Sequence, residues 1–361
     1  MNVKIVVYAI CKNEEKFVLR WMASMSEADQ IVVLDTGSTD NTVQLLRELG
    51  ADVTQEVISP WRFDTARNRS LELVPEDTDI CVCTDLDEMF IPGWRVQLEK
   101  AWIPGTTQCK YHYVWSTRDD GDGITFWNEK IHSREGWKWR HPVHEALEWF
   151  GESPRGGDVY ANEICLRHYP DLNKSRGQYL PLLELAVDED PNDDRSMHYL
   201  GREYMYYGRW DDCIQTLRRH LSLPSANWSD ERCASMRYIA RSFLEKGDIA
   251  SAKDWYLKAV AEAPHLREPY VDLAALLYKL EEWDGVIYIT GCALQIEEKS
   301  KFYICEESAW GSYPHDIRSI ALYQVGRTEE ALESAFRALE MEPGSTRLQE
   351  NVKILSRLTV S

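Results

Sequence analysis

The sequence predicts an α/β domain over residues 1–170 and an all-α domain of helical repeats over residues 171–361. Three observations lead there. Apolar segments of strand length alternate with helical patterns in the first half. Small and apolar residues recur with a period near 34 residues in the second half. The chain has 361 residues, 44% of them hydrophobic and 28% charged, which suits two globular domains.

The first half contains the elements of a sheet covered by helices. Strands are expected at residues 3–10, 30–34, 51–57 and 79–84, and helices at residues 14–25, 41–49 and 63–73. This alternation predicts parallel strands, whose carboxyl ends share one ligand-binding edge. The segments 109–116 and 123–132, with the Asp- and Gly-rich turn 119–123, predict a hairpin-like pair, and residues 159–168 predict a last strand.

The second half is helical and repetitive from about residue 173. A frame that starts at Cys233 recurs 34 residues later at Arg267. Small, apolar or aromatic residues hold matching positions in about four units: Leu200, Gly201, Tyr204, Gly208, Cys213 and Leu217; Ala240, Gly247, Ala252, Tyr256, Ala259 and Pro264; Ala274, Leu277 and Ala293; Ala331, Ala335, Ala338 and Pro343. This spacing resembles that of tetratricopeptide repeats, with an insertion near residues 298–313. Stacked helix pairs form a concave surface that binds a protein or substrate, or forms a homodimer.

Composition excludes several classes of protein. The net charge is −19, which disfavours binding to nucleic acid. No apolar run approaches the roughly 18 residues of a membrane span, and we interpret the N-terminal residues as a buried strand rather than a signal peptide. The nine cysteines are scattered and contain no Cys-x-x-Cys pair, as expected of reduced thiols in a cytoplasmic protein.

The main chemical feature is the segment Asp85-Leu86-Asp87 after the strand at residues 79–84. If the segment is extended, Asp85 and Asp87 lie on one face and Leu86 on the other. Paired carboxylates at the end of a parallel strand suit Mg²⁺ or Mn²⁺, which would neutralise a departing diphosphate. Taken alone, the pattern is equally compatible with a solvated acidic turn.

Other motifs strengthen the metal interpretation. Residues 32–42, with Asp35 at the end of a strand and the turn Gly37-Ser38-Thr39-Asp40, resemble the signature of family 2 glycosyltransferases of the GT-A fold. The turn also has a structural explanation, because Gly37 permits a sharp bend and Ser38 to Asp40 can cap a helix. The resemblance implies a nucleotide-sugar donor, most plausibly a UDP-hexose. It also implies donor contacts from residues that follow the strands and open the third helix: Cys11, Glu14, Asp35, Arg67, Asn68, Asp85 and Leu86.

Residues 130–148 match a narrower group. The segment Pro142-Val143-His144-Glu145 resembles that of glycosyltransferases with C-terminal tetratricopeptide repeats, including peptide S-glycosyltransferases that act on bacteriocins. The resemblance implies a hydroxyl or thiol acceptor, with a peptide or protein bound through the repeats as a candidate. An inverting transfer needs a base, for which we favour Glu145 over His144. The alternative is that His144 and Glu145 pair with each other or cap a helix.

His168 ends the last expected strand. In many GT-A enzymes a late histidine completes the metal site, so the resemblance implies that His168 joins Asp87, with Asp85, around Mn²⁺ or Mg²⁺. A phosphate contact or a plain hydrogen-bonded role remains open for His168. The expected enzyme is therefore an inverting, metal-dependent hexosyltransferase.

Two alternatives to this enzyme remain. Lys130, Arg134, Lys138 and Arg140 are interleaved with Trp127, Trp137 and Trp139. This strip keeps open a phage-type transferase that acts on a modified DNA base, although a half-buried hairpin explains it equally well. The second alternative is a repeat scaffold with an inactive transferase domain.

Overall fold

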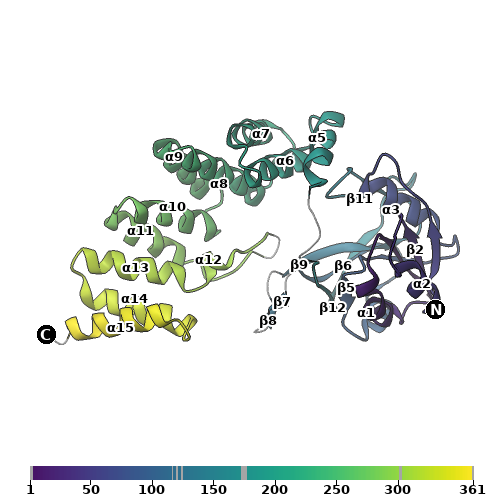
Figure 1. Cartoon of the computed structure of the whole chain (residues 1–361), viewed down its shortest axis with the longest axis horizontal. Coiled ribbons are helices and arrows are strands. Elements are labelled where there is room, and N and C mark those ends of the chain that lie inside the picture. Colours follow the sequence, from purple (N-terminus) through teal and green to yellow (C-terminus); the bar gives the residue numbers. More distant parts are fainter. Residues whose placement is uncertain are drawn as a thin grey trace. The chain divides into compact units, whose positions relative to one another are not determined.

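The computed structural model describes residues 3–115, 117–118, 121–122, 125–171, 177–300 and 303–359. The chain divides into two compact units, Met1–Glu189 and Asp190–Ser361 (Figure 1). We expected the division after residue 170. The helix α5, Tyr179–Glu189, groups instead with the first unit, because Phe63 and His144 pack on Tyr179 and Arg62 forms an ion pair with Glu189.

An eight-stranded mixed sheet with the order β3-β2-β1-β4-β9-β6-β12-β5 frames the first unit. Its strands are β1 Ile5–Cys11, β2 Gln30–Asp35, β3 Asp52–Gln55, β4 Ile80–Cys83, β5 Glu88–Phe90, β6 Thr106–Val114, β9 Thr125–Ser133 and β12 Gly157–His168. The first four are parallel, as the alternation predicts. β9 is antiparallel to both β4 and β6, so the expected hairpin-like pair exists and joins the sheet through β9.

Four helices connect and cover these strands. They are α1 Glu15–Met25, α2 Thr42–Glu48, α3 Phe63–Glu72 and α4 Trp94–Ala101. Two small sheets complete the unit: β7 Thr117–Arg118 with β8 Gly121–Asp122, and β10 Trp137–Arg140 with β11 Ala146–Trp149. The predicted turn 119–123 lies partly outside the described residues.

The core of this unit lies on both faces of the parallel strands. Along β1, Ile5, Val7 and Ala9 join one buried cluster with α1, whereas Val6 and Tyr8 join a second cluster with α3. A strand alternates its side chains between faces, so a strand buried on both faces must be apolar throughout. The continuous apolar run at the start of the chain is explained by this position.

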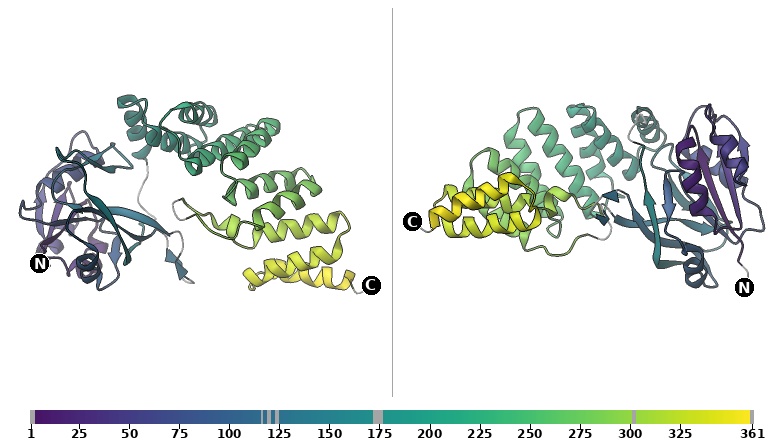
Figure 2. Two further views of the ribbon diagram at one scale, coloured as in Figure 1. Left: turned by 180° about the vertical axis from the view of Figure 1, so that it is seen from behind. Right: turned by 60° about the horizontal axis from the view of Figure 1, so that its bottom comes forward.

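The second unit consists of helices that pack in successive antiparallel pairs (Figure 2). The pairs are α6 Asp194–Tyr206 with α7 Trp210–Ser222, α8 Ser229–Glu245 with α9 Ile249–Glu262, α10 Glu268–Lys279 with α11 Trp283–Leu294, and α13 Tyr313–Gln324 with α14 Thr328–Met341. The insertion between α11 and α13 carries the short α12, Glu307–Trp310, and α15, Thr346–Thr359, packs on α14. The predicted all-α repeat domain is therefore confirmed.

The recurring small residues of the repeats explain how these helices pack. Ala240, Ala252 and Ala274 are fully buried between helices. Gly208 and Gly247 lie in the turns within the first two pairs with φ of 70° and 79°, a backbone conformation that glycine adopts without strain. Within the described part of the chain, no helix has the length and apolar character needed to cross a membrane.

Candidate active site

The carboxylates predicted to bind metal lie where β4 leaves the sheet. β4 ends at Cys83, and the backbone turns at once, since the Glu88 amide donates to the Asp85 carbonyl at 3.0 Å. The expected extended segment, with Asp85 and Asp87 on one face, is therefore wrong. The turn buries Leu86 in the core. Asp85 then pairs with Arg67, and Asp87 pairs with His168.

Arg67 is the centre of a buried ion-pair network. This residue on α3 is 4% exposed. Its Nη2 donates to Oδ1 of Asp85 at 2.8 Å and its Nε donates to Oε1 of Glu145. Its guanidinium also lies over the ring of Trp139, 5.2 Å from the centroid. Arg67 thus joins a predicted donor residue to the predicted base.

A second cation completes the network from the neighbouring strand. Nζ of Lys130 on β9 lies 3.2 Å from Oδ2 of Asp85 and 3.8 Å from Oε1 of Glu88. Glu88 is buried, and it accepts hydrogen bonds from the Tyr113 hydroxyl and the Asp85 amide, both at 2.9 Å. Burial opposes ionisation of Asp85, but Arg67 and Lys130 hold the pKa of its carboxyl well below the ordinary value. Burial instead raises the pKa of Glu88.

Sequence reasoning missed the roles of Lys130, Glu88 and Tyr113. The sequence pattern places Lys130 in the basic-aromatic strip, because it does not show that the hairpin pairs with β4. In the structure Val82 pairs with Ile131, which brings Lys130 to the end of β4 beside Asp85. The register of this antiparallel pair is the signal that would have found it.

Asp87 and His168 lie together as the sequence predicted. Oδ2 of Asp87 is 3.4 Å from Nε2 of His168, and the Asp87 carbonyl accepts from the Tyr169 amide at 2.7 Å. Nδ1 of His168 lies 3.0 Å from the Trp115 carbonyl. Burial lowers the pKa of His168, but the Asp87 carboxylate outweighs it and the pKa is raised.

A divalent cation fits Asp87 and His168 better than it fits Asp85. Ligand atoms bound to one such ion lie about 3 Å apart, close to the separation of this carboxylate oxygen and imidazole nitrogen. Both oxygens of Asp85 are occupied by Arg67 and Lys130. The geometry therefore favours Asp87 and His168 as metal ligands and gives Asp85 the task of holding two cations.

Three predicted donor residues lie at or just after the carboxyl ends of β1 and β2. Asp35 is buried and accepts the amides of Gly37 and Ser38 at 3.2 and 3.1 Å. Sγ of Cys11 lies 3.6 Å from Oδ2 of Asp35, and burial followed by the Asp35 charge raises the Cys11 pKa. Glu14 is buried, and its amide donates to Thr42 at 2.7 Å. These hydrogen bonds fix the backbone conformation of residues 35–42. The donor contacts of Cys11, Glu14 and Asp35 stay predictions.

Asn68 is held by the backbone of Trp139. Its Nδ2 donates to the Trp139 carbonyl at 2.8 Å and its Oδ1 accepts the Trp139 amide at 2.9 Å. These contacts fasten β10 to α3. The predicted donor role of Asn68 is not visible in this arrangement, and the side chain of Leu86, buried in the core, leaves only its backbone to face a donor.

The two candidate bases, His144 and Glu145, have different contact partners. Glu145 turns to Arg67, and the ring of His144 packs edge-on against Tyr179 at 5.7 Å between centroids. His144 has a φ of 53°, an uncommon conformation for a residue with a side chain. Glu145 thus lies in the polar network, and the base assignment stays a prediction.

The basic-aromatic strip does not form one surface. Along β10 the side chains alternate, so that Trp137 and Trp139 are buried and Lys138 and Arg140 are exposed. Trp127 stacks on His112 at 4.2 Å, and Arg134 donates to the Val74 carbonyl at 3.1 Å. Trp137 and Trp139 are therefore not available to stack on bases, and the alternative of a nucleic-acid acceptor stays a prediction.

Comparison with known families decides the nature of this domain. Residues 6–143 match the model of glycosyl transferase family 2, a range that contains β4, Arg67, Asp85 and Asp87. This part of the chain is a family 2 glycosyltransferase domain. The match ends just before His144 and Glu145. The C-terminal repeat unit lies outside it.

Solved structures also resemble part of the chain. MamA is 19% identical with a TM-score of 0.39, over 48% of this chain and 96% of MamA. YrrB, described as a TPR protein with an unusual peptide-binding site, is 16% identical with a TM-score of 0.39, over 49% and 83%. PilF of Pseudomonas aeruginosa is 16% identical with a TM-score of 0.38, over 47% and 70%.

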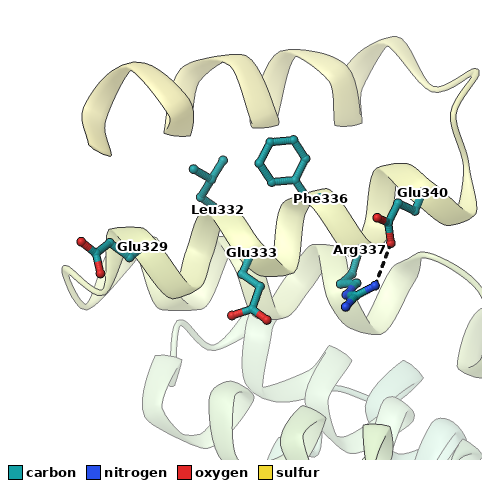
Figure 3. A pocket seen from close by; sticks show the side chains of 6 residues that line it. All are labelled: Glu329, Leu332, Glu333, Phe336, Arg337 and Glu340. Carbon is teal, nitrogen blue, oxygen red and sulfur yellow. Dashed lines mark hydrogen bonds and ion pairs between the residues drawn. The ribbon is translucent and has the colours of Figure 1, made fainter. Parts of the chain in front are cut away.

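A shallow depression lies on α14, outside the glycosyltransferase domain (Figure 3). Its volume is about 400 Å³, and six residues of this one helix line it: Glu329, Leu332, Glu333, Phe336, Arg337 and Glu340. Leu332 and Phe336 point toward the adjacent helix, and Arg337 pairs with Glu340 at 3.0 Å. An open surface of this kind does not resemble a site for a small substrate.

Proposed function

We propose that this chain is an inverting, metal-dependent glycosyltransferase that transfers a hexose from a UDP-sugar to a hydroxyl or thiol of an acceptor, and that the acceptor is a peptide or protein. The observation that carries the proposal is the pairing of Asp87 with His168 at the carboxyl end of β4. This pair lies beside the Arg67 network, within the unit that contains the family 2 domain.

Asp87 and His168 would hold Mn²⁺ or Mg²⁺. When bound, the ion supplies positive charge that stabilises the diphosphate leaving group. Lys130 and Arg67 carry further positive charge close to Asp85. Catalysis by such a site rests on positioning and on preorganised charge, because these groups need not reorganise during the reaction.

Glu145 is the proposed base. An inverting transfer requires removal of a proton from the attacking hydroxyl or thiol. Arg67 fixes one oxygen of the Glu145 carboxylate, which orients the other for an acceptor. His144 is the alternative, and its contact with Tyr179 gives it a different orientation.

A screen of nucleotide sugars for slow hydrolysis tests the proposal. We expect one UDP-hexose to be hydrolysed with Mn²⁺ and spared with EDTA, and mass spectrometry of peptide acceptors then to show the added hexose. The matched control is Asp77→Asn, which removes an exposed aspartate that pairs with Lys4. Absence of both hydrolysis and UDP binding would instead support the scaffold alternative.

A further inference from the structure

The helical unit contains a buried polar cluster unrelated to the sugar donor. Three successive helices contribute to it: His198 from α6, His220 from α7 and Glu231 from α8. Each residue offers a ligand atom, and these atoms all lie within 4.8 Å of one another. His198 and His220 are 2% and 0% exposed, and Glu231 is 7% exposed. Groups this polar are costly to bury without compensation.

Ser235, one helical turn after Glu231, orients both imidazoles. Its Oγ lies 2.7 Å from Nδ1 of His198 and 3.0 Å from Nδ1 of His220. A hydroxyl oxygen has two lone pairs and can accept from both rings. If it does so, Nε2 of His220 is unprotonated and able to bind a metal. Hydrogen bonds to the second ring nitrogen commonly orient metal-bound histidines in this way.

The strongest sign of a missing ligand in this cluster is the Nε2 atom of His220. It is buried, lies 3.4 Å from Oε1 of Glu231, and makes no hydrogen bond in the described structure. Buried polar atoms are rarely left unsatisfied. A cation between this nitrogen and the carboxylate would satisfy both groups. The ligand atom of His198, which lies within 4.8 Å of the other two, would move closer to share the same ion.

We propose that His198, His220 and Glu231 form a zinc site. Two imidazoles and one carboxylate match the ligands that Zn²⁺ takes in proteins, at about 2.0–2.2 Å. Harder ions such as Mg²⁺ prefer all-oxygen sets. The bound ion would cross-link α6, α7 and α8 and thereby stabilise the beginning of the repeat unit.

Metal analysis of the full-length chain tests this site. The protein is purified without a histidine tag, stripped with a chelator, dialysed and titrated with Zn²⁺ or Co²⁺. In the His168→Gln variant, which lacks a ligand of the proposed donor site, we expect one equivalent to bind with a rise in Tm, and Co²⁺ to give the visible absorption of low-coordinate nitrogen and oxygen ligands. His220→Gln and Glu231→Gln should each weaken binding at least tenfold.

Two controls separate this site from others. His168→Gln removes a ligand of the proposed donor site, and the helical zinc site should survive it. His265→Gln removes the histidine of an unrelated pair with Asp230 and should also retain zinc. No zinc uptake and no change in Tm for the wild-type chain would overturn the proposal and leave a hydrogen-bonded chain through Ser235. Retention of full affinity in both His220→Gln and Glu231→Gln would equally overturn it.

Discussion

Nε2 of His168 lies 3.4 Å from Oδ2 of Asp87. Because Nδ1 of the same ring faces the Trp115 carbonyl at 3.0 Å, both nitrogens meet acceptors and the imidazolium is favoured. The raised pKa of His168 reflects this balance of burial against the Asp87 charge. A proton therefore competes with a metal ion for this nitrogen.

The first prediction concerns pH and metal binding. Affinity for Mn²⁺ should fall roughly tenfold per pH unit below the raised pKa of His168, as measured by calorimetry across about pH 5.5 to 8.5. Without metal, the raised pKa contributes stability below the ordinary value of about 6.5, and this contribution is lost as pH rises through the folded pKa. His168→Gln should weaken binding and flatten its pH dependence; an unchanged slope would contradict the assignment.

Arg67 should contribute strongly to the stability of the first unit, because it pairs with two carboxylates at the end of β4. Arg67→Met leaves the carboxylates of Asp85 and Glu145 without their main partner. Removing one partner from a buried ion pair costs about 3–5 kcal/mol, and the 34% exposure of the Asp85 side chain places the expected loss nearer about 3 kcal/mol. Urea unfolding measures it. The double variant Arg67→Met/Glu145→Gln should recover part of the loss, and simple additivity would contradict coupling.

His132 should make the domain sensitive to acid. The Tyr8 hydroxyl lies 2.8 Å from Nε2 of this buried histidine and accepts from Trp139 at 3.0 Å. Burial lowers the His132 pKa to about 4. The depressed pKa gives stability that is present above about pH 6.5 and is lost as pH falls toward the folded value, about 3 kcal/mol in all. Chemical unfolding of wild type and His132→Gln should show a shallower pH dependence in the variant.

Asn68→Ala separates a structural role from donor binding. Loss of both hydrogen bonds to the Trp139 backbone should lower the unfolding free energy by about 1–3 kcal/mol. The affinity for UDP should be unchanged at a temperature where the variant is folded. Retained stability together with a large rise in the Kd for UDP would support the donor role inferred from sequence.

Local patterns predicted the architecture because hydrophobic periodicity and repeat spacing can be read from short stretches of sequence. The apolar β1 and the repeat spacing around Ala240 and Ala274 each record contacts that recur along the chain. The pairing of Asp87 with His168 was expected from the resemblance to family 2 glycosyltransferases and not from a local pattern, because the two residues are far apart in the sequence. Lys130 and the turn at Leu86 depend instead on which strands become neighbours and where β4 ends. Those are tertiary properties, so the partners of Asp85 could not be predicted.

The most direct test of the central claim is calorimetric titration of UDP into wild type and Asp87→Asn, each with Mn²⁺ and with EDTA. The Asn side chain keeps the size of Asp87 but loses the charge that faces His168. We predict Mn²⁺-dependent UDP binding in the wild type and its loss in Asp87→Asn. Thermal unfolding should be unchanged apart from the His168 contribution, and the control Asp77→Asn should bind UDP normally. Equal UDP affinity for Asp87→Asn and wild type in Mn²⁺, or wild-type binding unaffected by EDTA, would contradict it.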